Sequence, residues 1–168
     1  VSGFAPSLVN FRGPLLKALR ARGHEVVALA PADSILGGGP AAGGDVRGAL
    51  AELGIELFPF PMRRGGVDPA ADGRTLMALR GLFRRLRPEL VLPYTIKPVI
   101  YGSLAARMAG NIPVASLITG LGYAFGAGGD CDPAAALPLG RRVLRDVVIR
   151  LYRKALEGDF TRILTEAN

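Results

Sequence analysis

Hydrophobic positions along this chain of 168 residues follow two different periods. Short runs of consecutive apolar residues are typical of buried strands, whereas apolar residues three and four positions apart are typical of helices. The runs predict strands at residues 25–30, 55–58, 90–94, 114–118 and 160–165. The periodic stretches predict helices at residues 14–22, 45–53, 72–86, 98–109 and 133–156. Because strands and helices alternate and the strands are almost continuously apolar, the pattern indicates an α/β fold, a Rossmann-like parallel sheet with helices on both faces.

The chain is long enough for one domain with a sizeable core, and we expect residues 1–168 to form a single domain. The first three residues, Val1-Ser2-Gly3, read as the end of a further strand, so we expect the sequence to be a piece of a longer protein. The glycine-rich stretch 37–44 is expected to be a surface loop. A phosphate-binding loop would join a strand directly to a helix and end in Lys-Ser or Lys-Thr, and this stretch does neither.

The charge balance favours an acidic partner. The chain has 21 Lys and Arg residues against 14 Asp and Glu residues, a net charge of +7. Nucleic acid, anionic lipid and phosphorylated substrates would all suit this charge. Nucleic acid is not expected, because the arginines are not interleaved with aromatic residues. The single cysteine, Cys131, excludes an internal disulfide.

The sequence lacks the residues that several kinds of catalytic or binding site require. The only histidine, His24, falls in a turn between a predicted helix and a strand, so we expect a structural role for it. The chain contains neither a Gly-x-Ser-x-Gly motif nor a Cys–His pairing. No cluster of His, Cys and carboxylates has the spacing of a metal site, and no Gly-x-Gly-x-x-Gly motif is present. We therefore expect neither a metal ion nor a cofactor, and catalytic residues stay unassigned.

Three polar or cationic loops follow predicted strands: residues 2–13, 61–69 and 94–101, the last beside residues 119–123. The carboxyl ends of parallel strands meet at one edge of a sheet, where helix N-termini attract anions. We expect these loops to bind an anion there, most simply a phosphate. The candidate binding residues are Gly3, Asn10, Arg12, Arg63, Arg64, Thr95, Lys97, Tyr101, Thr119 and Gly120.

Five segments together resemble one family. They are Ser7-Leu-Val-Asn-Phe-Arg-Gly-Pro-Leu-Leu-Lys-Ala-Leu, Gly23-His-Glu-Val, Arg63-Arg-Gly-Gly-Val-Asp-Pro, Tyr94-Thr-Ile-Lys-Pro-Val-Ile-Tyr-Gly-Ser-Leu-Ala-Ala-Arg and Leu117-Ile-Thr-Gly-Leu-Gly-Tyr-Ala-Phe. The chain resembles the N-terminal half of bacterial family 4 glycosyltransferases of the GT-B fold. The most similar group adds a sugar to saccharides linked to undecaprenyl diphosphate. Tyr-Thr-Ile-Lys-Pro and Thr-Gly-Leu-Gly-Tyr are the most specific of these motifs.

The resemblance implies a retaining hexosyltransferase that uses a nucleotide-sugar donor and a glycan acceptor linked to a lipid diphosphate. Such enzymes act in cell-surface polysaccharide, lipopolysaccharide or glycoconjugate biosynthesis. Their C-terminal domain binds the donor and carries paired glutamates spaced Glu-x7-Glu, and that domain is absent from this sequence. The acceptor-side domain alone is expected to be inactive. Many relatives also carry a histidine where this chain has Thr119-Gly120, which leaves no residue for that role.

The same resemblance implies a cytoplasmic location, or a peripheral one on the inner face of the plasma membrane. Residues 141–154 are predicted to be basic on one helix face and apolar on the other, and could contact anionic lipid. In the alternative interpretation, the apolar stripe packs on the domain's own sheet.

Two other functions stay open at this point. A Rossmann domain of a sugar-nucleotide epimerase or dehydrogenase would share the parallel sheet, but needs a glycine fingerprint after the first strand. A non-enzymatic module that binds anionic lipid or polymer would also suit the charge.

Overall fold

The computed structural model describes residues 1–36, 45–63, 68–118, 149–150, 153–156 and, as backbone, 161–165. Its helices are α1 (Pro6–Asn10), α2 (Gly13–Ala21), α3 (Ala32–Leu36), α4 (Val46–Glu52), α5 (Pro69–Leu86) and α6 (Ile96–Gly110). Its strands are β1 (Val27–Pro31), β2 (Glu56–Phe60), β3 (Val114–Ile118) and β4 (Thr161–Thr165).

The strand pairings among the described residues are all parallel. β1 pairs with β2, with Val27 opposite Glu56, and β3 pairs with β4, with Val114 opposite Thr161. Residues 91–94 continue the sheet beside β3 through bridges at Val91 and Tyr94.

The first two residues connect these parts. The Ser2 N–H donates to the Leu29 carbonyl at 2.8 Å, and the Tyr94 N–H donates to the Val1 carbonyl at 3.2 Å. The spatial order is therefore β2, β1, residues 1–2, residues 91–94, β3, β4. This is the doubly wound order, in which the chain first builds outward to one side of a central strand and then to the other. The predicted Rossmann-like parallel sheet is confirmed.

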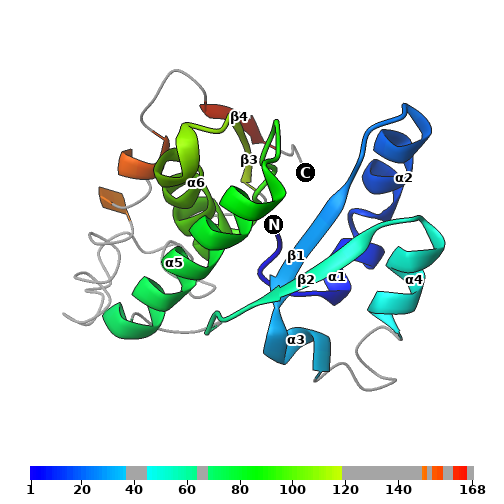
Figure 1. Ribbon diagram of the computed structural model, residues 1–168, viewed down its shortest axis with the longest axis horizontal. Coiled ribbons are helices and arrows are strands. Elements are labelled where there is room, and N and C mark those ends of the chain that lie inside the picture. The colour runs from blue at the N-terminus through cyan, green and yellow to red at the C-terminus, as the bar shows by residue number, and fades with distance from the viewer. Residues whose placement is uncertain (37–44, 64–67, 119–148, 151–152, 157–160, 166–168) are drawn as a thin grey trace, which may run out of the picture.

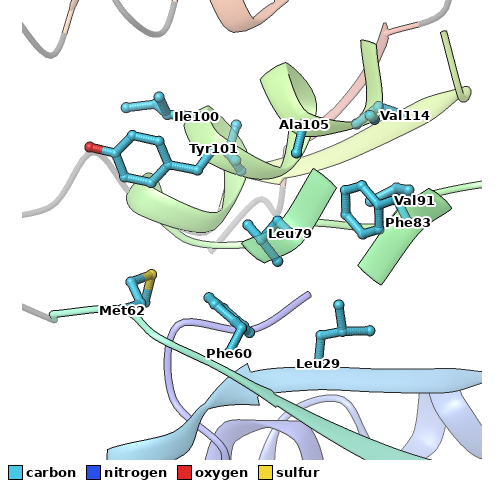
Figure 2. Close-up of a cluster of buried hydrophobic side chains, with 12 residues drawn as sticks. Leu29, Phe60, Met62, Leu79, Phe83, Val91, Ile100, Tyr101, Ala105 and Val114 are labelled. Carbon is cyan, nitrogen blue, oxygen red and sulfur yellow. The ribbon is translucent and has the colours of Figure 1, made fainter. Parts of the chain in front are cut away.

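Helices cover both faces of the sheet. In Figure 1, α2 and α4 lie on one side of β1 and β2, and α5 and α6 lie on the other. Successive side chains of β1 alternate between the two faces: Leu29 belongs to the hydrophobic cluster with α5 and α6, and Ala28 to the cluster with α1 and α4. Figure 2 shows Leu29 and Phe60 directed toward Leu79 of α5. Burial on both faces explains why the strands read as nearly continuous apolar runs.

The two longest helices begin and end at recognisable residues. The Asp68 carboxylate accepts hydrogen bonds from the Ala70 and Ala71 N–H groups, and Pro69 occupies the first turn of α5, where a missing N–H costs little. Arg87 ends α5 in a left-handed conformation, as Asn111 ends α6. Gly102 lets α6 approach the sheet closely, since a Cβ there would lie 3.3 Å from the Cβ of Pro93.

Some element boundaries differ from the predictions. The region 2–13 was expected to be a loop, but it contains α1 and the first residue of α2, and α3 follows β1 without having been predicted. α5 begins at Pro69 instead of residue 72 because of its Asp68 cap. α6 begins at Ile96, so Pro98 is its third residue and not its first.

The remaining predictions are tested only in part. Of the helix predicted at 133–156, the structure describes helical residues 149–150 and 153–156. Ala155, at the end of the predicted apolar stripe, is fully buried, and Leu156 packs against the core, which supports packing on this domain at that point. The stretch 37–44 and the rest of this helix lie outside the described residues. Among the helices of the described residues, none has the length and apolar character needed to cross a membrane.

We expect Leu79→Ala to lower the free energy of unfolding by about 2–5 kcal/mol, because it leaves a cavity between α5 and the sheet. Leu79 is fully buried. Met77, on the same helix, is 52% exposed, so Met77→Ala is the matched control, with an expected change below about 1 kcal/mol. Urea-induced unfolding followed by circular dichroism measures both, and equal effects would contradict the placement of α5.

Candidate functional site

A chain of hydroxyl groups joins the loop after residues 1–2 to the end of the 91–94 strand. The Ser2 and Ser7 hydroxyl oxygens lie 3.1 Å apart, and the Ser7 oxygen lies 3.0 Å from the Tyr94 hydroxyl. Each serine hydroxyl donates its one proton to the Phe4 carbonyl, at 2.7 and 2.6 Å, which leaves the Tyr94 hydroxyl as the donor to the Ser7 oxygen. These bonds bring the polar loop against the strand that neighbours it in the sheet, at the carboxyl edge.

Arg12 lies over the ring of Tyr94, the last member of this hydroxyl chain. It occupies the position before α2, where its carbonyl accepts from the Leu16 N–H at 2.9 Å. Its guanidinium carbon lies 5.1 Å from the centre of the Tyr94 ring, a cation–π distance. Burial raises the pKa of the Tyr94 hydroxyl, although its serine partners and Arg12 act in the opposite direction. The neutral Tyr94 ring therefore lies against the Arg12 guanidinium, which is always charged.

The turn between Tyr94 and α6 is strained. Thr95 has φ 69° and ψ 161°, a region that β-branched residues rarely occupy. Gly3 lies against it: a Cβ at Gly3 would lie 2.8 Å from the Thr95 hydroxyl oxygen and 3.4 Å from Cγ of Pro98. The close approach of the two loops thus requires glycine at position 3.

A second polar cluster lies where α5 meets α6. The Lys97 ammonium donates to Oδ1 of Asp72 at 3.1 Å, and both side chains are largely buried, at 15% and 8% exposure. Oδ2 of Asp72 accepts from the Asp68 N–H at 3.1 Å, and the Asp68 carboxylate pairs with Arg63 at 3.1 Å. Burial raises the pKa of the Tyr101 hydroxyl, and the negative charge of the Asp72 carboxylate raises it further. The hydrogen bonds from Ala71 and Arg63 lower the pKa of Asp68, with the Ala71 backbone as the largest cause.

The predicted residues fall into two groups. Gly3, Arg12 and Thr95 meet in the first cluster. Lys97, Tyr101 and Arg63 belong to the second, connected through Asp72 and Asp68. Asn10 is exposed at the end of α1. Arg64, Thr119 and Gly120 lie outside the described residues.

Sequence reasoning missed the partners. Ser2, Ser7, Tyr94 and Asp72 were not candidates, yet each holds a predicted residue or loop in place. The Asp68-Pro69 pair was a readable helix-start signal, and it would have placed Asp72 in the first turn. No comparable signal exists for the serines, which depend on the order of strands in the sheet.

Within the part of the chain that the structure describes, no group of three or more His, Cys, Asp or Glu side chains could hold a metal ion.

Comparisons with known proteins bear on the fold and on the family. The structure resembles that of Acinetobacter baumannii MurG, with a TM-score of 0.55 and 15% identity over the whole chain and 44% of MurG. This likeness establishes the shared fold, a Rossmann-like half of a GT-B protein. Residues 11–152 match the model of the glycosyl transferase 4-like domain, and the chain belongs to that family.

A curated relative is the N,N'-diacetylbacillosaminyl-diphospho-undecaprenol alpha-1,3-N-acetylgalactosaminyltransferase of Campylobacter jejuni. It is 26% identical over 117 residues, which cover 69% of this chain and 28% of the relative. The matched region is thus less than a third of that enzyme and less than half of MurG.

We expect Gly3→Ala to destabilise the protein by about 1–3 kcal/mol, because the added methyl group overlaps the Thr95 side chain. The second substitution Thr95→Gly removes both the overlap and the positive-φ strain, so Gly3→Ala/Thr95→Gly should recover most of the loss. Gly13→Ala is the matched control, because nothing lies within 4 Å of the Cβ it would add. Urea unfolding measures all three, and a Gly3→Ala variant as stable as Gly13→Ala would contradict the contact.

Proposed function

We propose that this domain is the acceptor-side half of a retaining, nucleotide-sugar-dependent glycosyltransferase. Its acceptor would be a glycan linked to a lipid diphosphate, as in cell-surface polysaccharide biosynthesis. The family match supports the general activity. The Campylobacter relative, whose name specifies a diphospho-undecaprenol acceptor, supports the acceptor class.

The observation that carries the proposal is the stacking of Arg12 on Tyr94. It joins the loop after residues 1–2 to the turn after residues 91–94, the two central strands of the sheet. The strand order reverses between these strands, and open α/β sheets bind ligands at such a point.

The chemistry of the two clusters suits a diphosphate. A guanidinium held by its face against an aromatic ring can still donate in its own plane to phosphate oxygens, two at a time. The first turn of α6, a helix of 15 residues, begins beside it at Ile96, and its free N–H groups favour a negative charge. Lys97 would add a second cationic donor. The other proposed binding residues are Gly3, Asn10, Arg63, Arg64, Thr95, Tyr101, Thr119 and Gly120.

The rest of the reaction belongs to the proposal as well. The nucleotide sugar would bind a second domain, and the acceptor hydroxyl would meet it in the cleft between the two. We propose no catalytic residue within this domain. A polyprenyl-linked acceptor would bring the enzyme to the inner face of the plasma membrane as a peripheral protein.

We expect Arg12→Met in the full-length enzyme to lower kcat/KM for a lipid-diphosphate-linked acceptor by tenfold or more, about 1.4 kcal/mol. The substitution keeps an apolar side chain over Tyr94 but removes the guanidinium N–H groups that would donate to phosphate oxygens. Steady-state transfer of a radiolabelled sugar from its nucleotide measures the effect.

Arg22→Met is the matched control, because Arg22 is exposed at the opposite end of α2. It should leave kcat/KM within twofold of the parent value. Equal kinetics for Arg12→Met and the parent enzyme would contradict the assignment of Arg12, and an enzyme that transfers no sugar to lipid-diphosphate acceptors would contradict the function itself.

A further inference from the structure

Asp72 is a buried carboxylate on which two donors converge. The Lys97 ammonium donates to one oxygen and the Asp68 N–H to the other, each at 3.1 Å. The charge of this carboxylate also raises the pKa of the Tyr101 hydroxyl, after the larger effect of burial. Figure 2 shows the Tyr101 hydroxyl pointing away from the apolar cluster that holds its ring. Asp72 is buried, so its contacts are made almost entirely within the protein.

The ion pair fixes a side chain that would otherwise be flexible. A lysine ammonium ends a four-carbon stem with many rotamers, and burying it without a counter-charge is costly. Beside Asp72, the Lys97 ammonium has a counter-charge at 3.1 Å that holds it in place, two residues after the strained Thr95. An ammonium has three N–H groups, and one bonds to Asp72; within the described residues the hydrogen bonds give Lys97 no second acceptor, so the other two N–H groups are the candidates for donating to a ligand.

The Asp72 carboxylate also connects Lys97 to the loop at residues 61–63. Its second oxygen holds the Asp68 backbone, and Asp68 in turn caps α5 and pairs with Arg63. Residues 61–63 follow β2, whereas Lys97 follows the 91–94 strand. Asp72 therefore ties together two loops that the sheet separates by two intervening strands.

We propose that Asp72 is a positioning residue that acts through Lys97: it holds the Lys97 ammonium where its remaining N–H groups bind the acceptor diphosphate. The inference rests on the proposed function for the identity of the ligand. Because the Asp72–Lys97 pair is neutral as a whole, the contribution of Lys97 comes from directed N–H donors and not from excess charge. Loss of Asp72 should then weaken acceptor binding even though it removes a negative charge.

The decisive substitution is Asp72→Asn, which preserves shape. An amide offers one acceptor oxygen where the carboxylate offers two, so its NH2 group would face a donor in either orientation. In the full-length enzyme, we expect Asp72→Asn to raise the acceptor KM at least fivefold and to change kcat less than twofold. In a Lys97→Met background, the same substitution should change KM less than twofold.

Thr75→Val is the control for a merely structural effect. Thr75 lies one turn further along α5, is buried, and donates to the Pro61 carbonyl at 2.8 Å. Its substitution should lower stability and leave the acceptor KM unchanged. A KM that is unchanged or lower in Asp72→Asn, or that rises equally in both Lys97 backgrounds, would overturn the proposal.

A second measurement needs no activity. The full-length protein is acetylated with acetic anhydride and analysed by mass spectrometry. The quantity measured is the ratio of the acetylation rate of Lys97 to that of the exposed Lys17. We expect Lys97 to react at least tenfold more slowly than Lys17, and Asp72→Asn to narrow this ratio at least threefold, unlike Thr75→Val. If the enzyme transfers no sugar to lipid-diphosphate acceptors, the proposed function fails. The labelling then decides by itself whether Asp72 positions Lys97, and an unchanged ratio overturns that role.

Discussion

The arrangement of the sheet's carboxyl edge depends on a few backbone hydrogen bonds made by the first two residues of the chain. Ser2 bonds to β1 on one side, and Val1 bonds to the 91–94 strand on the other. Through these bonds two pairs of strands become one parallel sheet, and the polar loops that follow residues 2 and 94 become neighbours. The contacts between Arg12 and Tyr94, and between Gly3 and Thr95, exist only because of this arrangement.

The cations at this edge differ in how they are held, and this difference matters for binding. The Arg63–Asp68 pair is exposed, at 72% and 38%, and such pairs contribute little to stability. The Lys97–Asp72 pair is largely buried, so removing either partner leaves a charge that water cannot reach easily. Arg12 has an aromatic face beneath it. A fixed donor loses less conformational entropy when a ligand binds, which is why buried or stacked cations suit a binding site better than exposed ones.

The sequence predicted the sheet well and its contacts poorly. β3 was predicted with both boundaries because Val114–Ile118 is a short apolar run between a helix end and a glycine-rich stretch. α1 was missed because five residues that include Pro and Asn resemble a loop. Arg12 and Lys97 do lie in loops that follow the two central strands, as predicted, since topology alone determines that. Their partners could not be predicted, because Lys97 and Asp72 are 25 residues apart and meet only where two helices cross.

The strained backbone at Thr95 indicates that the turn between residues 91–94 and α6 is held firmly in place. A threonine at positive φ persists only where surrounding contacts outweigh its cost of about 1–3 kcal/mol. Those contacts lie on both sides: Gly3 packs against the threonine side chain, and Lys97, two residues later, is anchored to Asp72. The turn is thus held from the first loop and from α5 at once. Because these contacts come from separate segments, the placement of Lys97 and of Arg12 over Tyr94 depends on the packing of several elements at this edge and not on either residue alone.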